Sequence, residues 1–230
     1  ELIFSDEEVY DASISHTQRD RNTDLIYISY STPKTQSRTY LYNLKTKEKK
    51  LVKEQIIPSG HDPKNYVVER VECNSDDGRK VPLTITRHKD TPLDGSANLL
   101  LYGYGSYGAS MSPSFSSTRL SLINRNIIWV TAHIRGGMER GMKWWKEGKL
   151  LNKKNTFNDY IAAAKFLIEK KYTSKGKIIG MGGSAGGLLM GAVVNKAPDL
   201  FLGMIMAVPF VDSLTTNLDN SLPLTIGEFY

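Results

Sequence analysis

The sequence lacks the features that mark secreted and membrane proteins. It has one cysteine, Cys73, in 230 residues, so it cannot form an internal disulfide, and a reducing compartment is expected rather than secretion. No apolar run reaches the roughly 18 residues of a membrane-spanning helix. Residues 1–8 lack the basic and apolar regions of a signal peptide. We therefore expect a cytoplasmic protein with no membrane partner.

The distribution of charge argues against a further class of partner. The 30 basic and 24 acidic residues give a net charge of +6, which on its own fits an anionic partner. However, the densest basic cluster, residues 45–53, contains Glu48 and lies between two strand-like segments. This pattern is typical of a solvated hairpin rather than a nucleic-acid surface. We expect no nucleic acid, no metal and no cofactor.

Residues 1–65 have the pattern of an antiparallel sheet. β-branched and aromatic residues, or a shorter apolar run, fill three segments separated by turn formers: 25–30, 38–44 and 50–53. Such short strands form one unit of a repeated sheet, and one unit alone cannot bury both of its faces. We place a domain boundary in the turn-forming segment 58–63, so that residues 1–65 and 66–230 are expected to be separate domains.

The second part of the chain alternates between strand and helix patterns. After a hairpin about residues 76–78, apolar residues at helical spacing predict a helix over 156–170, with Thr156 and Asp159 as a capping pair at its start. The other expected elements are strands at 98–102, 127–132, 177–181 and 203–208, and helices at 115–125 and 185–195. This alternation predicts an α/β fold with a doubly wound parallel sheet covered by helices on both faces.

A glycine-flanked serine lies between one of these strands and the helix after it. Gly182, Ser184 and Gly186 satisfy the pattern Gly-x-Ser-x-Gly. This pattern forms a sharp turn in which the serine is strained and only small neighbours fit. Alone, the pattern also fits a glycine-rich turn with an incidental serine. The strand before it and the helix after it favour a nucleophile elbow.

The sequence lacks an obvious base for this serine, because a serine nucleophile needs a histidine that an acid orients. All four histidines precede Ser184: His16, His61, His88 and His133. His133 is a candidate base at the end of an apolar strand, although a structural histidine is the favoured interpretation. Asp212 and Asp219 follow the serine closely in sequence. We therefore expect a chain that carries the nucleophile without its base.

Five segments, in matching order, resemble the prolyl oligopeptidase family of serine peptidases, and within it the oligopeptidase B branch: YGYGSYGA (102–109), HIRGG (133–137), KKNTFNDY (153–160), MGGSAGG (181–187) and VPFVD (208–212). The resemblance is strong over residues 60–230 and looser before them. It implies an α/β-hydrolase domain, here C-terminally incomplete, preceded by the last strands of a β-propeller. The implied activity is cleavage of short peptides after Arg or Lys.

The resemblance also assigns roles to particular residues. It makes Ser184 the nucleophile, and it makes the Tyr104 hydroxyl and the backbone N–H of Ala185 the oxyanion hole. From the sequence alone, a tyrosine after the strand at 98–102 fits either an oxyanion donor or a residue that caps the core. Phe210 would line the S1 pocket, and the Glu228 carboxylate would pair there with a substrate guanidinium.

The sequence departs from this family at several positions. Tyr230 stands where relatives often have a second S1 glutamate. Ser112 and Ser114 replace acidic residues that some relatives use for a basic P2 side chain, so a preference for paired basic residues is not implied. The catalytic Asp and His of the family lie beyond Tyr230, and most of the propeller would precede Glu1.

Three hypotheses follow. The first is a piece of a serine peptidase that acts on short basic peptides and is completed by a chain carrying the missing Asp and His. The second is a small esterase of the same fold, and the third is a catalytically inert truncated or split-gene product. If the sheet stops after the strand at 203–208, we also expect an unpaired apolar edge.

Overall fold

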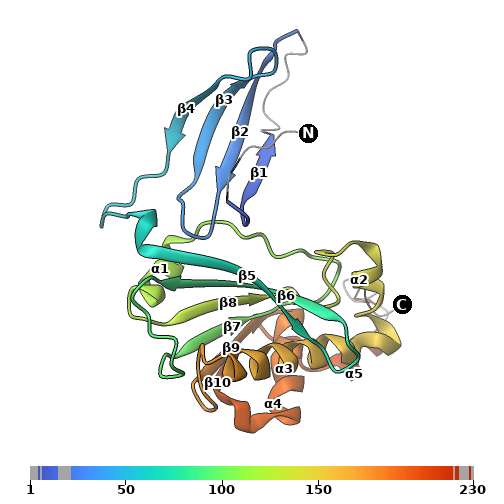
Figure 1. Ribbon diagram of the computed structural model, residues 1–230. Helices are drawn as coiled ribbons and strands as arrows, with labels where there is room; N and C mark the ends of the chain where they lie inside the picture. The colour runs from blue at the N-terminus through green and yellow to red at the C-terminus, as the bar shows by residue number, and fades with distance from the viewer. Residues whose placement is uncertain (1–4, 6, 15–21, 220, 223–227, 229–230) are drawn as a thin grey trace.

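Two separate sheets organise the chain. The computed structural model describes residues 5, 7–14, 22–219, 221–222 and 228, and Figure 1 shows the smaller sheet standing on a larger α/β unit. The smaller sheet is antiparallel, with strands in the order β1-β2-β3-β4. Its strands are β1 (Asp11–Ile14), β2 (Leu25–Ser31), β3 (Arg38–Asn43) and β4 (Lys49–Glu54).

The smaller sheet buries few side chains. Ile28 and Tyr42 form its buried centre, whereas every residue of β4 is exposed. The basic cluster at residues 45–53 therefore lies in the exposed β3–β4 hairpin, as its charge pattern predicts. That this sheet is the end of a propeller domain stays a prediction.

The larger sheet is mixed, with strand order β10-β9-β7-β8-β6-β5. Strands β7 to β10 are parallel, whereas the β5–β6 hairpin joins them antiparallel through β6 and β8. Its strands are β5 (Tyr66–Asn74), β6 (Lys80–His88), β7 (Leu99–Tyr102), β8 (Ile128–Ala132), β9 (Ile178–Gly183) and β10 (Phe201–Ala207). All the strands expected in this region are present, each within a few residues of its predicted bounds.

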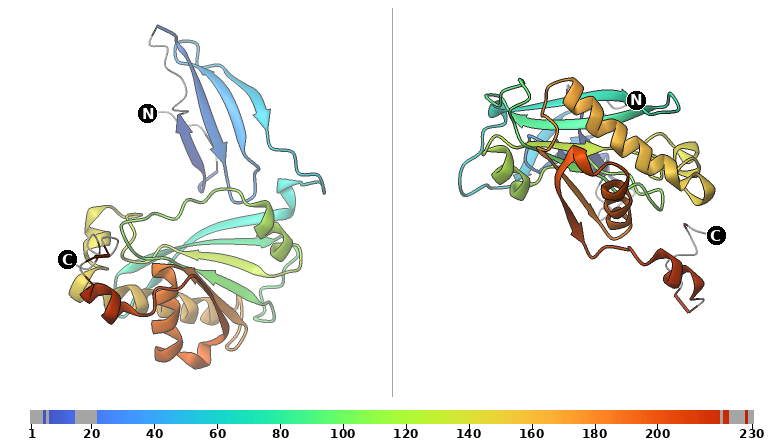
Figure 2. Two further views of the ribbon diagram at one scale, coloured as in Figure 1. Left: turned by 180° about the vertical axis from the view of Figure 1, so that it is seen from behind. Right: turned by 90° about the horizontal axis from the view of Figure 1, so that it is seen from below.

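Helices cover both faces of the larger sheet, as predicted. The helices α3 and α4 pack on one face and α1 packs on the other, as the two views of Figure 2 show. Two short helices, α2 and α5, escape the sequence analysis because neither has enough turns to show a period. The bounds are α1 (Ser117–Ile123), α2 (Met142–Lys146), α3 (Lys153–Glu169), α4 (Ala185–Lys196) and α5 (Ser213–Leu218), with 3₁₀ turns at Pro63–Asn65, Leu150–Asn152 and Pro198–Leu200.

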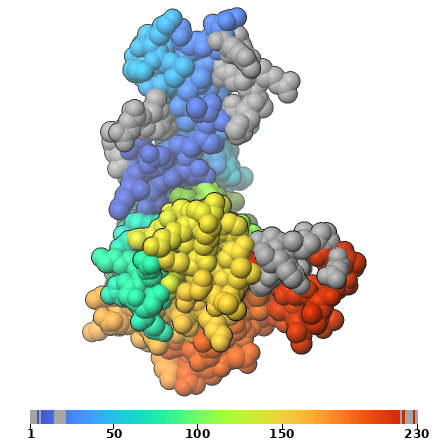
Figure 3. Space-filling model, turned by 90° about the vertical axis from the view of Figure 1, so that its right-hand side faces the viewer, coloured from blue at the N-terminus to red at the C-terminus, as the bar shows by residue number. Residues whose placement is uncertain are grey.

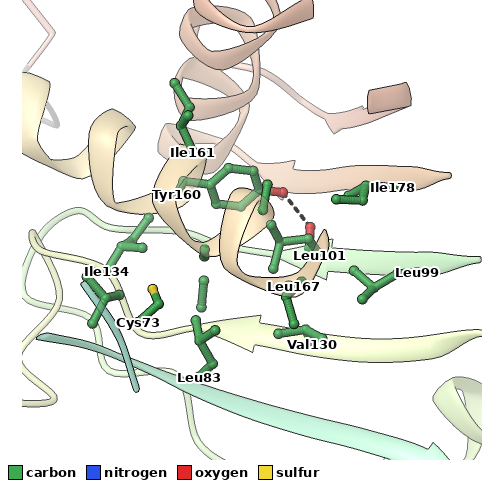
Figure 4. Close-up of a cluster of buried hydrophobic side chains, with 14 of the residues drawn as sticks. Cys73, Leu83, Leu99, Leu101, Val130, Ile134, Tyr160, Ile161, Leu167 and Ile178 are labelled. Atoms are coloured by element: carbon green, nitrogen blue, oxygen red, sulfur yellow. Dashed lines mark hydrogen bonds between the residues drawn. The ribbon is translucent and has the colours of Figure 1, made fainter. Parts of the chain in front are cut away.

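The main core lies between the sheet and the helices α3 and α4. Figure 4 shows Tyr160 of α3 over the strands, where its hydroxyl donates to the carbonyl oxygen of Leu101 at 2.5 Å. Tyr160 is fully buried, as are Leu101, Leu167 and Ile178. Each such aliphatic side chain contributes roughly 1.5–3 kcal/mol by leaving water. This packing fixes α3 against the carboxyl end of β7.

The expected capping pair at the start of α3 is wrong. The helix begins at Lys153, and Asn152 at its N-cap makes no side-chain cap bond. Thr156 instead donates to the carbonyl oxygens of Arg135 and Gly148, at 2.9 and 3.1 Å. Asp159 binds Arg135. Both polar side chains therefore make tertiary rather than local bonds.

The pair of Arg135 and Asp159 is a buried ion pair. Nε and Nη2 of Arg135 donate to the two oxygens of Asp159 at 2.8 and 2.6 Å, and the backbone N–H of Arg135 donates at 3.0 Å. Asp159 is 0% and Arg135 2% exposed. Ser75 donates to Asp159 at 2.6 Å, and Asp77 accepts from Arg135 Nη1 at 2.5 Å. Burial lowers the pKa of Arg135, but its bonds to the two aspartates outweigh burial and raise it.

The edge strand β10 departs from the prediction that helices cover the whole sheet. Among the described strands it pairs only with β9, and Figure 2 shows the chain leaving its end toward α5, which stands away from the sheet. Several apolar side chains here are exposed: Leu202 (63%), Ile205 (44%), Met206 (42%) and Val208 (85%). A long apolar edge is a template for association.

We expect this edge to drive self-association of the 230-residue chain. Leu202→Lys places a charge on the edge strand and should shift the mass measured by analytical ultracentrifugation toward the 25.8 kDa of one chain. Leu93→Lys is the matched control, because Leu93 is an exposed leucine (43%) in the loop after β6. A wild-type chain that stays monomeric at high concentration contradicts the expectation.

We expect Arg135→Met to lower the free energy of unfolding by about 3–5 kcal/mol, because it leaves the buried Asp159 carboxylate without its cation. Urea denaturation measures the loss. Arg140→Met is the control: Arg140 pairs with Glu72 where both side chains are 40% exposed, so about 1 kcal/mol or less is expected. The double variant Arg135→Met/Asp159→Leu should recover much of the loss. A loss below about 1 kcal/mol for Arg135→Met rules out the structural role.

Candidate active site

Ser184 lies at the junction of β9 and α4 in a strained conformation. Its φ of 54° and ψ of −117° are outside the regions that residues with a side chain normally adopt. Such strain costs about 1–3 kcal/mol and persists only where surrounding bonds hold it. The Ser184 N–H donates to the carbonyl oxygen of Ala207, and its carbonyl accepts from the N–H groups of Gly187 and Phe210, all at 2.8–2.9 Å. The side chain is exposed. The predicted sharp strand-to-helix turn is therefore present.

The two flanking glycines leave no room for a side chain. A Cβ on Gly182 would lie 2.2 Å from the carbonyl oxygen of Gly186, and a Cβ on Gly186 would lie 2.8 Å from the carbonyl oxygen of Gly103. Both partners are backbone atoms, so neither can rotate away. The glycines thus allow the start of α4 to approach its own strand and the loop after β7. This contact supports the sequence-based reason for the small residues.

Strand register brings Tyr104 to Ser184. The strands β7 and β9 are parallel neighbours, and Tyr102 pairs with Met181. The N–H of Gly103 donates to the carbonyl oxygen of Met181 at 3.1 Å. Two or three residues beyond this pair, Tyr104 and Ser184 lie beside each other, close enough for the serine side chain to affect the pKa of the Tyr104 hydroxyl.

The Tyr104 hydroxyl is a proton donor at neutral pH. Burial raises its pKa, the charges of Glu228 and Tyr102 raise it further, and the Ser184 side chain lowers it in part. Ala185 is the first residue of α4 and is buried. Its N–H belongs to the first helical turn, which has no intrahelical acceptor. The two predicted oxyanion donors therefore flank the serine.

Glu228, near the end of the chain, contacts the loop after β7 that carries Tyr104. Its carboxylate is 0% exposed and accepts from the Tyr107 N–H at 2.8 Å and from the Trp145 indole N–H at 3.2 Å. Lys153 Nζ lies 3.1 Å from the other oxygen. Glu228 therefore has three donors within the protein.

Phe210 is held next to the elbow by its backbone bond to Ser184, and its side chain is half-buried. The structure thus brings four of the predicted site residues around Ser184 or onto the loop after β7: Tyr104, Ala185, Phe210 and Glu228. Tyr230 and His16 lie outside the described residues.

The other candidate acids and bases are engaged elsewhere. His133 follows β8, which β7 separates from β9, about 10 Å away. Its Nε2 bonds to Thr84 at 2.8 Å and its Nδ1 lies 3.4 Å from Glu139. Burial lowers the pKa of His133. These contacts fit the favoured structural interpretation of this histidine.

The remaining described histidines also have structural contacts. His61 bonds to the carbonyl oxygen of Lys34 at 2.7 Å, and His88 lies 3.5 Å from Asp90. Asp212 caps α5 by accepting from the Thr215 N–H. Asp219 accepts from Ser221, and these bonds lower its pKa.

Ser112 and Ser114, which the family resemblance places at the P2 site, lie in the segment between the two sheets. Ser112 donates to Asp11 of β1 at 2.6 Å, so it connects the smaller sheet with the larger unit. Figure 3 shows this junction from the side, with the blue strands on top of the larger unit. The Ser114 carbonyl oxygen accepts from Arg119 at 3.3 Å.

Over the described ranges, no group of three or more His, Cys, Asp or Glu side chains is placed to hold a metal ion. In the same part of the chain, no helix has both the length and the apolar character needed to cross a membrane.

Lys153 is the site residue that the sequence analysis missed. Lys153 begins the segment 153–160, to which the resemblance assigns no catalytic role. Its ammonium group nevertheless lies between the loop after β7 and Glu228. The one available signal was a lysine at the start of the clearest helix, just before its apolar face. Sequence alone cannot show that such a lysine is buried.

Known proteins resemble this chain over most or all of its length. A family model described as "Prolyl oligopeptidase family" matches residues 113–230. The chain is 45% identical over its whole length to dipeptidyl aminopeptidase BI of Pseudoxanthomonas mexicana, and covers 32% of it. It is 45% identical over 229 residues to protease 2 of Moraxella lacunata, which is 99% of this chain and 33% of that protein.

A solved structure gives the same picture. Oligopeptidase B from Trypanosoma brucei, in a closed form with covalently bound antipain, matches 98% of this chain with a TM-score of 0.92 and 40% identity, and 32% of that chain is covered. The chain therefore spans about a third of the length of the curated relatives it matches.

We expect Gly182→Ala to lower the free energy of unfolding by about 1–3 kcal/mol, because its Cβ would collide with backbone at the elbow. Gly203→Ala is the matched control: Gly203 also lies in a parallel strand, but a Cβ there meets nothing within 4 Å. Chemical denaturation of both variants gives the comparison. Equal stabilities would mean that the elbow relaxes freely and that the close approach is unimportant.

Proposed function

Because the chain belongs to the prolyl oligopeptidase family, we propose that Ser184 is the nucleophile of a serine peptidase that hydrolyses short peptides through an acyl-enzyme. The observation that carries this proposal is the strained serine between β9 and α4, next to which the register of β7 and β9 places Tyr104. Covalently bound antipain in the oligopeptidase B of T. brucei supports a nucleophilic residue in this family.

The proposed reaction starts with attack of Ser184 Oγ on the scissile carbonyl. Negative charge then develops on the carbonyl oxygen, and the Ala185 N–H and the Tyr104 hydroxyl donate to it. One such donor contributes about 10²–10³ in kcat. A base takes the Ser184 hydroxyl proton during attack and gives it to the amine as the peptide C–N bond breaks. Water then hydrolyses the resulting ester, which releases the acid and restores the Ser184 hydroxyl.

The base is the part that this sequence does not supply, since no histidine follows Ser184 and the described ones are engaged elsewhere. We propose that a complementing polypeptide brings the Asp and His that the family uses. The alternative of an inert product rests on the same observation. A cytoplasmic location stays a prediction.

The proposed substrates are short peptides with Arg or Lys at P1. Glu228 supports this, because its carboxylate is buried next to the loop that carries Tyr104. A carboxylate has about four acceptor sites, and three donors bind it here, so a substrate cation would add to or displace one of them. Phe210, whose N–H donates to the Ser184 carbonyl oxygen, would pack on the P1 side chain.

The proposed function is tested by reconstitution. The chain is mixed with the C-terminal part of a relative such as protease 2, which supplies the Asp and His, and hydrolysis of fluorogenic peptides ending in Arg or Pro is measured. We expect cleavage after Arg that Ser184→Ala abolishes. No hydrolysis, together with no fluorophosphonate labelling of Ser184, would support the inert product. Labelling of the isolated chain would refute it.

We expect Glu228→Gln to lower kcat/KM for a P1 Arg peptide by about 100-fold, because it removes the charge that pairs with the guanidinium. Peptides with a neutral P1 residue should be affected far less. Glu169→Gln is the control, since Glu169 is a largely exposed carboxylate (73%) at the end of α3. Unchanged selectivity in Glu228→Gln would reject the S1 assignment.

A further inference from the structure

We propose that Lys153 is a positioning residue that holds Tyr104 and Glu228 together as one unit, so that oxyanion stabilisation and P1 recognition are coupled. This inference rests on the proposed function, in which Tyr104 donates to the oxyanion and Glu228 binds the P1 cation. The roles that the family resemblance implies do not include Lys153, and its contacts alone identify it.

The ammonium group of Lys153 is fully used inside the protein. Lys153 is 9% exposed, and its Nζ donates to the carbonyl oxygen of Gly105 at 2.7 Å, to Ser106 Oγ at 2.5 Å and to Glu228 Oε1 at 3.1 Å. An ammonium has three protons, so each has one acceptor. Because all three protons are hydrogen-bonded inside the protein, Lys153 fixes the positions of Gly105, Ser106 and Glu228 relative to α3.

Two of these acceptors directly follow Tyr104 in the chain. Gly105 has a φ of 68°, and Ser106 is 0% exposed. The next residue, Tyr107, donates its N–H to Glu228 Oε2 at 2.8 Å. Three successive residues after the tyrosine are therefore bound either to Lys153 or to the carboxylate that Lys153 pairs with. The rigid first turn of α3 thereby sets where the Tyr104 hydroxyl lies.

Charge gives Lys153 a second effect, on Glu228. Burial lowers the pKa of Lys153, and the Glu228 charge opposes that shift. Lys153 already neutralises much of the Glu228 charge. A substrate cation at Glu228 therefore competes with Lys153 for the same carboxylate. Removing the lysine charge should therefore strengthen the attraction of Glu228 for a P1 cation while it weakens the hold on Tyr104.

These two effects predict opposite changes in two kinetic constants. In the reconstituted peptidase, Lys153→Met should lower kcat by about 10–100-fold, because Tyr104 loses its position. KM for a P1 Arg peptide should fall by about threefold or more, because an unpaired buried carboxylate attracts the guanidinium. A residue that only supports the fold would not lower KM. Lys154→Met is the control, since Lys154 is exposed and next in sequence.

A double-mutant cycle tests whether Lys153 acts through Tyr104. Tyr104→Phe should lower kcat by about 10²-fold, and adding Lys153→Met should then lower kcat by less than about twofold, because coupled residues are not additive. Full additivity, or an unchanged kcat in Lys153→Met alone, overturns the inference. An unchanged kcat in Tyr104→Phe instead rejects the oxyanion role in the proposed function.

A spectroscopic readout tests the same point without catalysis. With 3-fluorotyrosine at position 104, the ¹⁹F resonance of the chain itself should move or broaden in Lys153→Met and stay in place in Lys154→Met. An unmoved resonance in Lys153→Met contradicts the inference. If Lys153→Met does not fold, Lys153→Arg keeps the charge but cannot meet the three acceptors in the same geometry. It should then show the same ¹⁹F change and kcat loss, with KM unchanged.

Discussion

The buried ion pair between Arg135 and Asp159 is the interaction on which the arrangement of the site depends. It fixes α3 to the segment after β8 and, through Ser75 and Asp77, to the β5–β6 turn. Polar groups on the same side of α3 hold other segments in the same way. Each donates a hydrogen bond to a carbonyl oxygen: Lys153 to Gly105 in the loop after β7, Thr156 to Arg135 and Tyr160 to Leu101. One helix thus sets where the carboxyl ends of β7 and β8 lie.

The proposed nucleophile depends on a different constraint, which is steric. Ser184 adopts its unusual backbone because Gly182 and Gly186 permit backbone contacts that a Cβ would prevent. The parallel register of β7 and β9 then brings Tyr104 alongside. Two fixed supports therefore meet at the serine: the elbow provides Ser184 and the Ala185 N–H, and α3 holds the loop with Tyr104. Catalysis by such donors depends on this preorganisation, since they need not move during the reaction.

The sequence predicts the fold class and the centre of the site, because both depend on local patterns. The α/β sheet, its α/β-hydrolase character and the strand-rich start agree with solved relatives, and the family resemblance is confirmed. Long-range polar bonds could not be predicted. Asp159 looks like half of a capping pair, yet its partner Arg135 is 24 residues away. Glu228 and Lys153 are 75 residues apart, and no local spacing relates them. The mixed sheet, and the position of β10 at its edge among the described strands, likewise depend on strand order, which periodicity does not give.

The central claim is that Ser184, the Ala185 N–H and Tyr104 form a preorganised nucleophile and oxyanion hole. A crystal structure of the reconstituted peptidase after reaction with a fluorophosphonate tests it most directly, because the phosphonyl oxygen occupies the place of the oxyanion. We predict a covalent bond to Ser184 Oγ, with that oxygen about 2.7–3.1 Å from the Ala185 nitrogen and the Tyr104 hydroxyl. Attachment to another residue, or an oxygen directed away from both donors, would contradict the account.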